Sequence, residues 1–164
     1  GISNYKPAEA VRAFEILESL GTHCLIHQPK YSMFERWVEG GLLDLLEEKG
    51  VGCIPFSPLA QGLLTDKYLK GIPVDSRAGR PEGFLQKEEV SASRISQITK
   101  LNTLALGREQ TLAQMALSWL LKDPRVTSVL VGASRPEQLS DSLKCLNNLT
   151  FTKDELTTIN DILA

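Results

Sequence analysis

Three groups of residues have the types and spacing to bind a ligand, and the first follows the most β-branched run of the sequence, residues 126–131. Gly132 ends that run, and Ser134 and Arg135 open a predicted helix with a capping-box sequence. Free N–H groups at a helix start bind phosphate, and an arginine adds a two-pronged donor. The spacing is equally compatible with a plain helix cap and a solvated surface cation. Both interpretations stay open at this point.

The second group begins at Phe56, where FSPLAQG ends a predicted strand and leads into a long loop over residues 60–82 that carries Lys67 and Arg77. An aromatic ring at a strand tip can stack on a flat heterocycle, and cations on a loop can close over a diphosphate. The alternative is that Phe56 belongs to the core and both cations are ordinary surface charges. The residues taken by themselves favour this alternative.

The third group is Gln28, which follows another apolar run and whose amide can pair with an amide-bearing ligand; before Pro29 it is otherwise an ordinary strand end. The neighbouring His23 and His27 are four residues apart, which in a strand separates them by about 13 Å. That is too far to share a metal, so we predict no metal site and expect His27 to be a hydrogen-bonded core residue. No dinucleotide-finger, P-loop or hydrolase-elbow motif is present.

The elements that must position these groups alternate along the chain. Apolar runs predict strands at residues 23–28, 51–56 and 126–131, after a strand remnant at 1–3. Helical patterns and caps predict helices at residues 7–20, 41–49, 88–106, 112–121, 134–147 and from 152 to the end. The alternation indicates parallel strands with helical crossovers and both sheet faces covered. A doubly wound sheet and part of a (β/α) barrel both fit this order.

Composition limits the function classes. The chain has 164 residues, 42% hydrophobic and 23% charged, which is typical of one folded domain. With 18 Lys and Arg against 20 Asp and Glu it lacks the basic field that nucleic acid requires, and no apolar run is long enough for membrane insertion. An odd set of three cysteines, Cys24, Cys53 and Cys145, predicts buried, reduced thiols in a cytoplasmic protein. Because the chain starts inside an apparent strand, we interpret it as a piece of something longer.

Five segments, taken in order, resemble the aldo-keto reductases: GISNY, HQPKYSMFER, PFSPLAQGLLTDKY, DSR and VLVGASRPEQL. The most similar branch holds the potassium-channel β subunits and the bacterial glyceraldehyde-phosphate reductases. The likeness covers the whole chain but matches only the second half of that family's barrel. It therefore implies an α/β fold, the C-terminal half of a (β/α)8 TIM barrel, with residues 1–164 forming one partial NADP-dependent oxidoreductase domain.

The resemblance also implies NADPH bound in an extended pose across the mouth of the barrel. At the nicotinamide end, the resemblance assigns Ser3, Asn4 and Gln28 to the carboxamide and Phe56 to the ring. Along the diphosphate it assigns Ser57, Pro58, Leu59, Gln61 and Gly62, with Lys67 and Arg77 closing over it. At the other end, the 2'-phosphate is assigned Gly132, Ser134, Arg135 and Gln138, and the adenine is assigned Asp141 and Ser142. The 2'-phosphate position coincides with the phosphate site inferred above from the residues.

The sequence departs from the family's pattern at three places. Asp66 stands where a glycine is usual, and its carboxylate beside Lys67 is expected to weaken the diphosphate contact. Asp141 and Ser142 replace a glutamate and an asparagine. The family's catalytic Asp, Tyr, Lys and His belong to the first half of the barrel, so no catalytic residue is assigned here.

The resemblance implies that the parent protein reduces aldehydes or ketones to alcohols with NADPH in the cytoplasm. Its expected partners are a small carbonyl substrate and the missing N-terminal half-barrel, and a homo-oligomer is left open. We expect this chain alone to be inactive as a reductase. The alternatives are a non-catalytic regulatory or binding subunit of the channel β-subunit type and an inactive truncated product.

Overall fold

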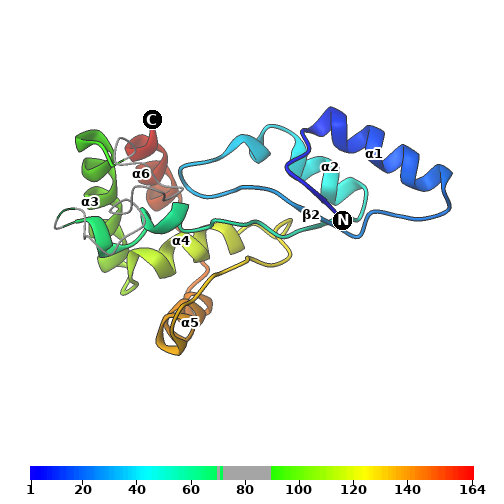
Figure 1. Cartoon of the computed structure of the whole chain (residues 1–164). Helices are drawn as coiled ribbons and strands as arrows, with labels where there is room; N and C mark the ends of the chain where they lie inside the picture. The colour runs from blue at the N-terminus through cyan, green and yellow to red at the C-terminus, as the bar shows by residue number, and fades with distance from the viewer. Residues whose placement is uncertain (70, 72–89) are drawn as a thin grey trace.

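The computed structural model describes residues 1–69, 71 and 90–164. The chain is elongated, with a small sheet and two helices at one end and a group of helices at the other (Figure 1). The sheet end carries α1 (Pro7–Ser19) and α2 (Leu42–Glu48), and the helical end is formed by α3 (Ala92–Gly107), α4 (Leu112–Leu121) and α6 (Lys153–Leu163). The short helix α5 (Pro136–Leu143) projects to one side (Figure 1).

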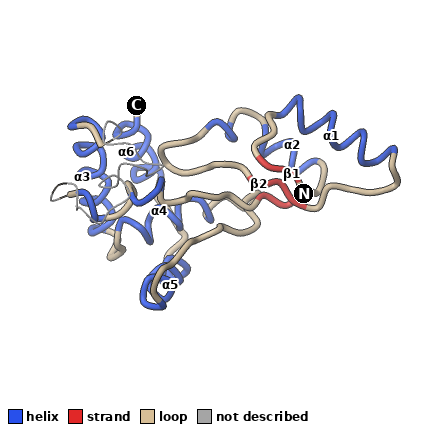
Figure 2. The backbone as a smooth tube through the Cα atoms, in the orientation of Figure 1, coloured by secondary structure: helices blue, strands red, loops and turns tan. Residues whose placement is uncertain are grey.

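The sheet has the predicted parallel order. Strands β1 (Ile2–Ser3), β2 (Ile26–Gln28) and β3 (Gly52–Cys53) lie side by side in sequence order (Figure 2). Helix α1 crosses over between the first two strands and α2 between the second and the third, as parallel pairing requires. The carboxyl ends of the three strands therefore lie at one edge.

The strands are shorter than the apolar runs predicted. The expected strand over residues 126–131 is wrong as a regular strand, because only Val126 pairs with β3, through a bridge to Cys53. The segment still runs alongside, with the amide of Thr127 donating to the Cys53 carbonyl at 2.9 Å and that of Leu130 to the Pro55 carbonyl at 2.9 Å. Pro55 has no N–H to return, which interrupts the ladder at that point.

The helical end follows the sequence closely. Helix α4 starts where its capping box predicted, with the Thr111 hydroxyl accepting from the Gln114 amide and the Gln114 side chain accepting from the Thr111 amide. The same device, formed by Thr152 and Glu155, opens α6. Eight of the ten residues of α4 are buried, because α3, α5 and the 3₁₀ turn Lys144–Asn147 (η6) pack around it.

All three cysteines are buried and unbridged, as the sequence predicted. Among the described residues, no helix combines the length and the apolar character that crossing a membrane would need.

Candidate functional site

The ends of β1 and β2 bring together three of the predicted ligand-binding residues, Ser3, Asn4 and Gln28. Ser3 and Gln28 are direct partners in the parallel register. The Ser3 hydroxyl donates to the Gln28 carbonyl at 2.8 Å, and the Asn4 amide donates to the same carbonyl at 3.2 Å. The Asn4 side-chain oxygen accepts from the Lys30 amide at 2.8 Å. These contacts join the turn after β1 to the end of β2.

Hydrogen-bonding capacity remains at this point. Within the part of the chain that the structure describes, the Gln28 side-chain amide has no hydrogen-bond partner, and the Asn4 side chain uses only its oxygen. An amide offers two donors and an acceptor, so this pair can bind a ligand carboxamide through both groups.

Phe56 extends the same edge beyond β3. Its amide donates to the Pro29 carbonyl at 3.0 Å, and its carbonyl accepts from the Tyr31 amide at 3.4 Å. The side chain is half-buried, which leaves part of the ring exposed. Phe56 therefore follows the strand next to β2 and pairs with Lys30, two residues beyond Gln28, and its assignment to the nicotinamide ring stays a prediction.

The loop that follows is conformationally strained. Ser57, Ala60 and Gln61 have positive φ values of 54°, 45° and 58°, and Asn4 has one of 58°. Left-handed conformations of residues other than glycine cost about 1–3 kcal/mol each and gather at ligand sites. Of the five such residues that the structure describes, four lie in these two loops. The strained residues accordingly lie at the same carboxyl end of the sheet as the side-chain amides of Asn4 and Gln28.

The remaining predicted diphosphate residues are arranged around this loop. Pro58 is buried, and the Leu59 carbonyl accepts from the Gly62 amide at 2.8 Å, which tightens the turn. Lys67 is exposed in the short turn η3 (Asp66–Tyr68), directly after Asp66. Arg77 lies outside the described residues.

The predicted phosphate site at the start of α5 has a different cap from the one expected. The capping box from Ser134 to Glu137 is wrong: Arg135 is the N-cap residue and its side chain makes no cap hydrogen bond. Instead the Gln138 side-chain oxygen accepts from the amide of Ser134 at 2.8 Å and from its hydroxyl at 3.1 Å. The helix begins one residue later than predicted, so Gln138, and not Glu137, is the third helical residue, whose side chain can fold back onto the residues before the helix.

The charge of Arg135 is available at this position. The side chain is exposed, and no carboxylate of the described residues forms an ion pair with it. Gly132 is exposed as well, and its ideal Cβ position meets no atom within 4 Å.

The two predicted adenine residues are partly occupied by the chain itself. The Asp141 carboxylate accepts from the Gln114 side-chain amide at 2.7 Å, and the Ser142 hydroxyl donates to the Gln138 carbonyl at 2.8 Å. Lys144 lies 3.7 Å from the same Asp141 carboxylate. Their assignment to the adenine stays a prediction.

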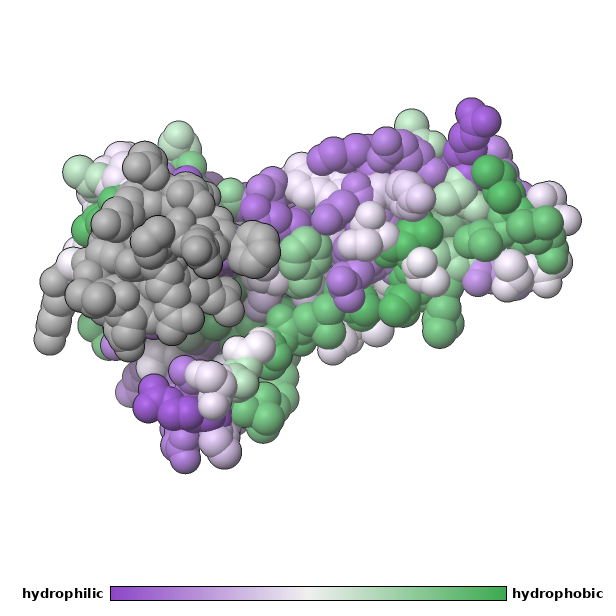
Figure 3. Space-filling model, viewed as in Figure 1, coloured by the Kyte–Doolittle hydropathy of each residue, from purple (hydrophilic) through white to green (hydrophobic). Residues whose placement is uncertain are grey.

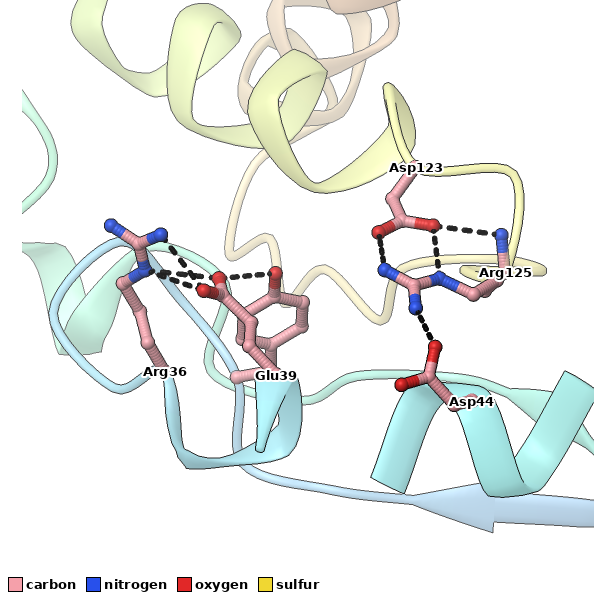
Figure 4. Close-up of polar contacts among 6 residues, drawn as sticks. Arg36, Glu39, Asp44, Asp123 and Arg125 are labelled. Carbon is pink, nitrogen blue, oxygen red and sulfur yellow. Dashed lines mark hydrogen bonds and ion pairs between the residues drawn. The ribbon is translucent and has the colours of Figure 1, made fainter. Parts of the chain in front are cut away.

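Sequence reasoning missed a polar junction between the two ends of the molecule. The Arg36 guanidinium donates to the Glu39 carboxylate at 2.8–3.0 Å (Figure 4). It also donates to the Asn160 side chain of α6 at 2.8 Å. Nearby, Arg125 bridges Asp123 and Asp44 of α2 (Figure 4). The hydrogen bonds from Arg125 lower the pKa of Asp123. The short spacing of Asp123 and Arg125 was a local signal of this pair.

The two described cavities of note lie away from the predicted cofactor residues. One, of about 530 Å³, is lined by Phe34, Arg94 and Asn160 among others, and the second, of about 690 Å³, by Lys122, Arg125 and Phe151 among others. The side-chain amides of Asn4 and Gln28 instead lie at the carboxyl ends of the strands, outside both cavities.

Comparison with known proteins agrees with the architecture. Residues 1–164 match the family model described as Aldo/keto reductase family. L-glyceraldehyde 3-phosphate reductase of Escherichia coli (strain K12) is 52% identical over 169 residues, which cover 100% of this chain and 49% of that protein. A probable voltage-gated potassium channel subunit beta of Arabidopsis thaliana is 36% identical over 143 residues, covering 85% of this chain and 43% of that protein.

A solved structure, that of a glycerol dehydrogenase from Gluconobacter oxydans, superposes with a TM-score of 0.78 at 26% identity, covering 100% of this chain and 48% of that one. The chain thus spans about half the length of the relatives it matches. The predicted fold, a partial parallel α/β barrel, is confirmed, as is the resemblance inferred from the sequence segments.

Proposed function

The chain belongs to the aldo/keto reductase family, and we propose that it forms the NADPH-binding half of an enzyme that reduces aldehydes or ketones to alcohols. The observation that carries this proposal is the pair of amides of Asn4 and Gln28, with free hydrogen-bonding capacity, beside the exposed part of Phe56. They lie at the carboxyl ends of parallel strands, where ligands bind in α/β barrels. Bound NADPH would supply the hydride.

The chain's own residues would bind and orient the cofactor. Asn4 and Gln28 hold the carboxamide and so decide which face of the nicotinamide ring points into the barrel, while Phe56 covers the other side. The strained turn over residues 57–62 is preorganised to follow the diphosphate. Arg135, exposed and without an ion-pair partner among the described residues, is free to pair with a 2'-phosphate.

We propose that a further half-barrel completes the fold and carries the catalytic residues. Leu130 and Val131 are exposed on the outer side of the segment next to β3, at 41% and 37%, although they follow a run of strand type. Hydrophobic residues gather over the sheet end on the face that Figure 3 shows. A second set of strands would cover them and pair the open edge. The chain alone is then expected to reduce no carbonyl compound.

A non-catalytic binding subunit is the second candidate function. The similarity to a potassium-channel β subunit favours it, but at 36% identity this similarity is lower than the 52% shared with the L-glyceraldehyde 3-phosphate reductase. Reductase activity of the complete protein towards a small aldehyde, followed by NADPH absorbance, would separate the two. Binding of NADPH without its oxidation by any aldehyde tested would favour the subunit.

The proposed reaction takes place in the cytoplasm. Burial and the absence of a bridge at all three cysteines support a reducing compartment.

The cofactor proposal is tested by the affinities of NADPH and NADH, measured by fluorescence titration of the complete protein. Arg135→Glu should lower the affinity for NADPH by about tenfold or more, since a hydrogen bond to a charged group contributes roughly 1.5–3 kcal/mol. The affinity for NADH, which lacks the 2'-phosphate, should change little. The matched control is Arg12→Glu, which reverses an exposed charge on α1. Equal losses for both cofactors would contradict the assignment of Arg135.

A further inference from the structure

His27 lies in the middle of β2 and is fully buried, whereas the chain's other histidine, His23, is exposed. Its Nε2 lies 3.1 Å from the Tyr5 carbonyl oxygen. Because a carbonyl only accepts, Nε2 carries the hydrogen. Nδ1 is buried and has no hydrogen-bond partner in the described part of the chain. The hydrogen bond that the ring makes among the described residues is thus the one that it donates to the backbone of the turn after β1.

That turn contains Asn4, which the proposed function places on the cofactor. Asn4 has a φ of 58°, a left-handed conformation that asparagine adopts more readily than other non-glycine residues and that contacts with neighbouring residues select here. Its own amide and side chain are tied to the Gln28 carbonyl and the Lys30 amide at the exposed side of the sheet edge. The hydrogen bond from His27 to the next residue, Tyr5, is the buried anchor of the same turn.

The surroundings of the ring suit only its neutral form. Its neighbours in register are Ile2 of β1 and Cys53 of β3. Burial, assisted by the nearby charge of Asp123, raises the pKa of Cys53 to about 12, so that thiol is uncharged at neutral pH. Burial likewise lowers the pKa of His27, and the hydrogen bond to Tyr5 opposes the shift. A proton on Nδ1 would be a buried charge without an acceptor.

We infer that His27 is a positioning residue for the cofactor: through the Tyr5 carbonyl, its neutral ring holds Asn4 in the conformation that presents the Asn4 amide beside Gln28. The inference rests on the proposed function and adds a residue on the opposite face of β2 from Gln28, since successive strand residues face opposite sides. Protonation in acid would place an unpaired charge on the buried Nδ1, so the ring should leave this position, which would loosen the turn and weaken binding of the nicotinamide end.

The test compares two ligands in the complete protein. NADPH probes the whole site, and adenosine 2',5'-bisphosphate probes its adenine end without the nicotinamide. His27→Leu removes the donor and should lower the affinity for NADPH by about tenfold, the loss expected for one buried hydrogen bond. It should leave the affinity for the bisphosphate unchanged within about twofold, the scatter usual for surface effects. His27→Gln places an amide N–H at similar reach and should restore most of the NADPH affinity.

The pH profile separates positioning from general stabilisation. The 2'-phosphate, which titrates near pH 6, is common to both ligands, but the bisphosphate also has a titrating 5'-phosphate that NADPH lacks. The ratio of NADPH to bisphosphate affinity is therefore compared at each pH with the same ratio in His27→Gln, which keeps the ligand titrations and removes that of His27. Relative to His27→Gln, the wild-type ratio should fall only in acid below the ordinary histidine range, because burial lowers the pKa of His27. Equal losses of both ligands in His27→Leu, or a wild-type ratio that follows the His27→Gln ratio at every pH, would overturn the inference. Failure of the wild type to bind NADPH at all would instead refute the proposed function.

Discussion

A buried network at the helical end and the candidate site at the sheet end differ in how completely their polar groups are paired. At the helical end, the side chain of Arg108 is only 3% exposed and is fully paired. It contacts Glu155 at 2.8 Å, the Thr150 carbonyl at 3.0 Å and the Gln110 side chain at 3.1 Å. At the sheet end, by contrast, the Gln28 side-chain amide and Nδ1 of His27 have no hydrogen-bond partner among the described residues.

The buried network at the helical end extends beyond Arg108. The Gln110 side chain donates to the Ser118 hydroxyl and the Asn148 carbonyl, and Ser118 donates to the Cys145 carbonyl at 2.9 Å. These contacts link α4 to the loops before and after it. Every member has a partner, the condition under which a buried polar network stabilises a fold.

The difference follows from how the two kinds of element make hydrogen bonds. A helix pairs its backbone within itself, so α3, α4 and α6 need only cover their apolar faces. A parallel strand takes its hydrogen bonds from neighbours, so a sheet with open edges stays incomplete until more strands arrive. The candidate cofactor residues lie at this incomplete end, which is consistent with a site shared between two halves of a barrel.

Trp119 joins the two ends, and its removal should have the largest effect on stability. The ring meets Tyr31 of the loop after β2 edge-on at 5.6 Å, and Arg36 lies 5.1 Å from its centroid. We expect Trp119→Ala to lower the free energy of unfolding by about 4 kcal/mol, measured by urea unfolding. Trp37→Ala is the control, since that ring is only half-buried, and should cost clearly less. Equal costs would show that Trp119 does not join the ends.

Arg108 tests whether the helical end is stabilised by its network. Arg108→Ala leaves Glu155, Gln110 and the Thr150 carbonyl without their donor, and should cost about 3 kcal/mol, as for other broken buried pairs. Lys153→Ala, an exposed change at the start of α6, is the control and should be nearly neutral. The readout is the far-UV circular dichroism transition in urea. A loss below that of the control variant would show that the network contributes nothing.

The junction of Asp123 and Arg125 should make stability depend on pH. Hydrogen bonds from Arg125 lower the pKa of Asp123 in the folded state. The stabilisation is therefore complete above the ordinary carboxyl pKa near 4 and is lost as the pH falls through the lower folded value. We expect a loss of up to about 1 kcal/mol, because the pair is partly exposed. Unfolding at pH 6 and pH 3 measures it. Asp123→Asn should remove this part of the slope, and an unchanged slope would exclude Asp123 as its source.

The exposed edge should give the smallest effect on the chain itself. Val131→Lys introduces a charge at an already exposed position, and we expect a change within about 0.5 kcal/mol. The same substitution should block assembly with a separately produced N-terminal half-barrel, monitored by size-exclusion chromatography. The matched change Leu117→Lys, at a buried position of α4, should unfold the helical end. If Val131→Lys assembles normally, the open edge is not the contact surface.

The sequence was sufficient where structure depends on near neighbours. The bounds of α4 and its capping box were predicted residue by residue from Thr111 and Gln114, because that motif is closed within four residues. Gln28 and Phe56 were proposed from the residues, and Ser3 and Asn4 from the family resemblance. Strand pairing in register explains why all four lie at the carboxyl end of the sheet, and their role in cofactor binding stays a prediction.

Features that depend on contacts between distant residues came only with the tertiary structure. The length of the strands and the broken pairing at Pro55 depend on which backbone groups lie opposite one another. So does the hydrogen bond between the His27 side chain and the Tyr5 carbonyl, which crosses 22 residues. Helices and their caps depend on residues a few positions apart, so the sequence predicts them directly. The sheet, and the candidate site at its carboxyl end, form only when segments far apart in the sequence pair.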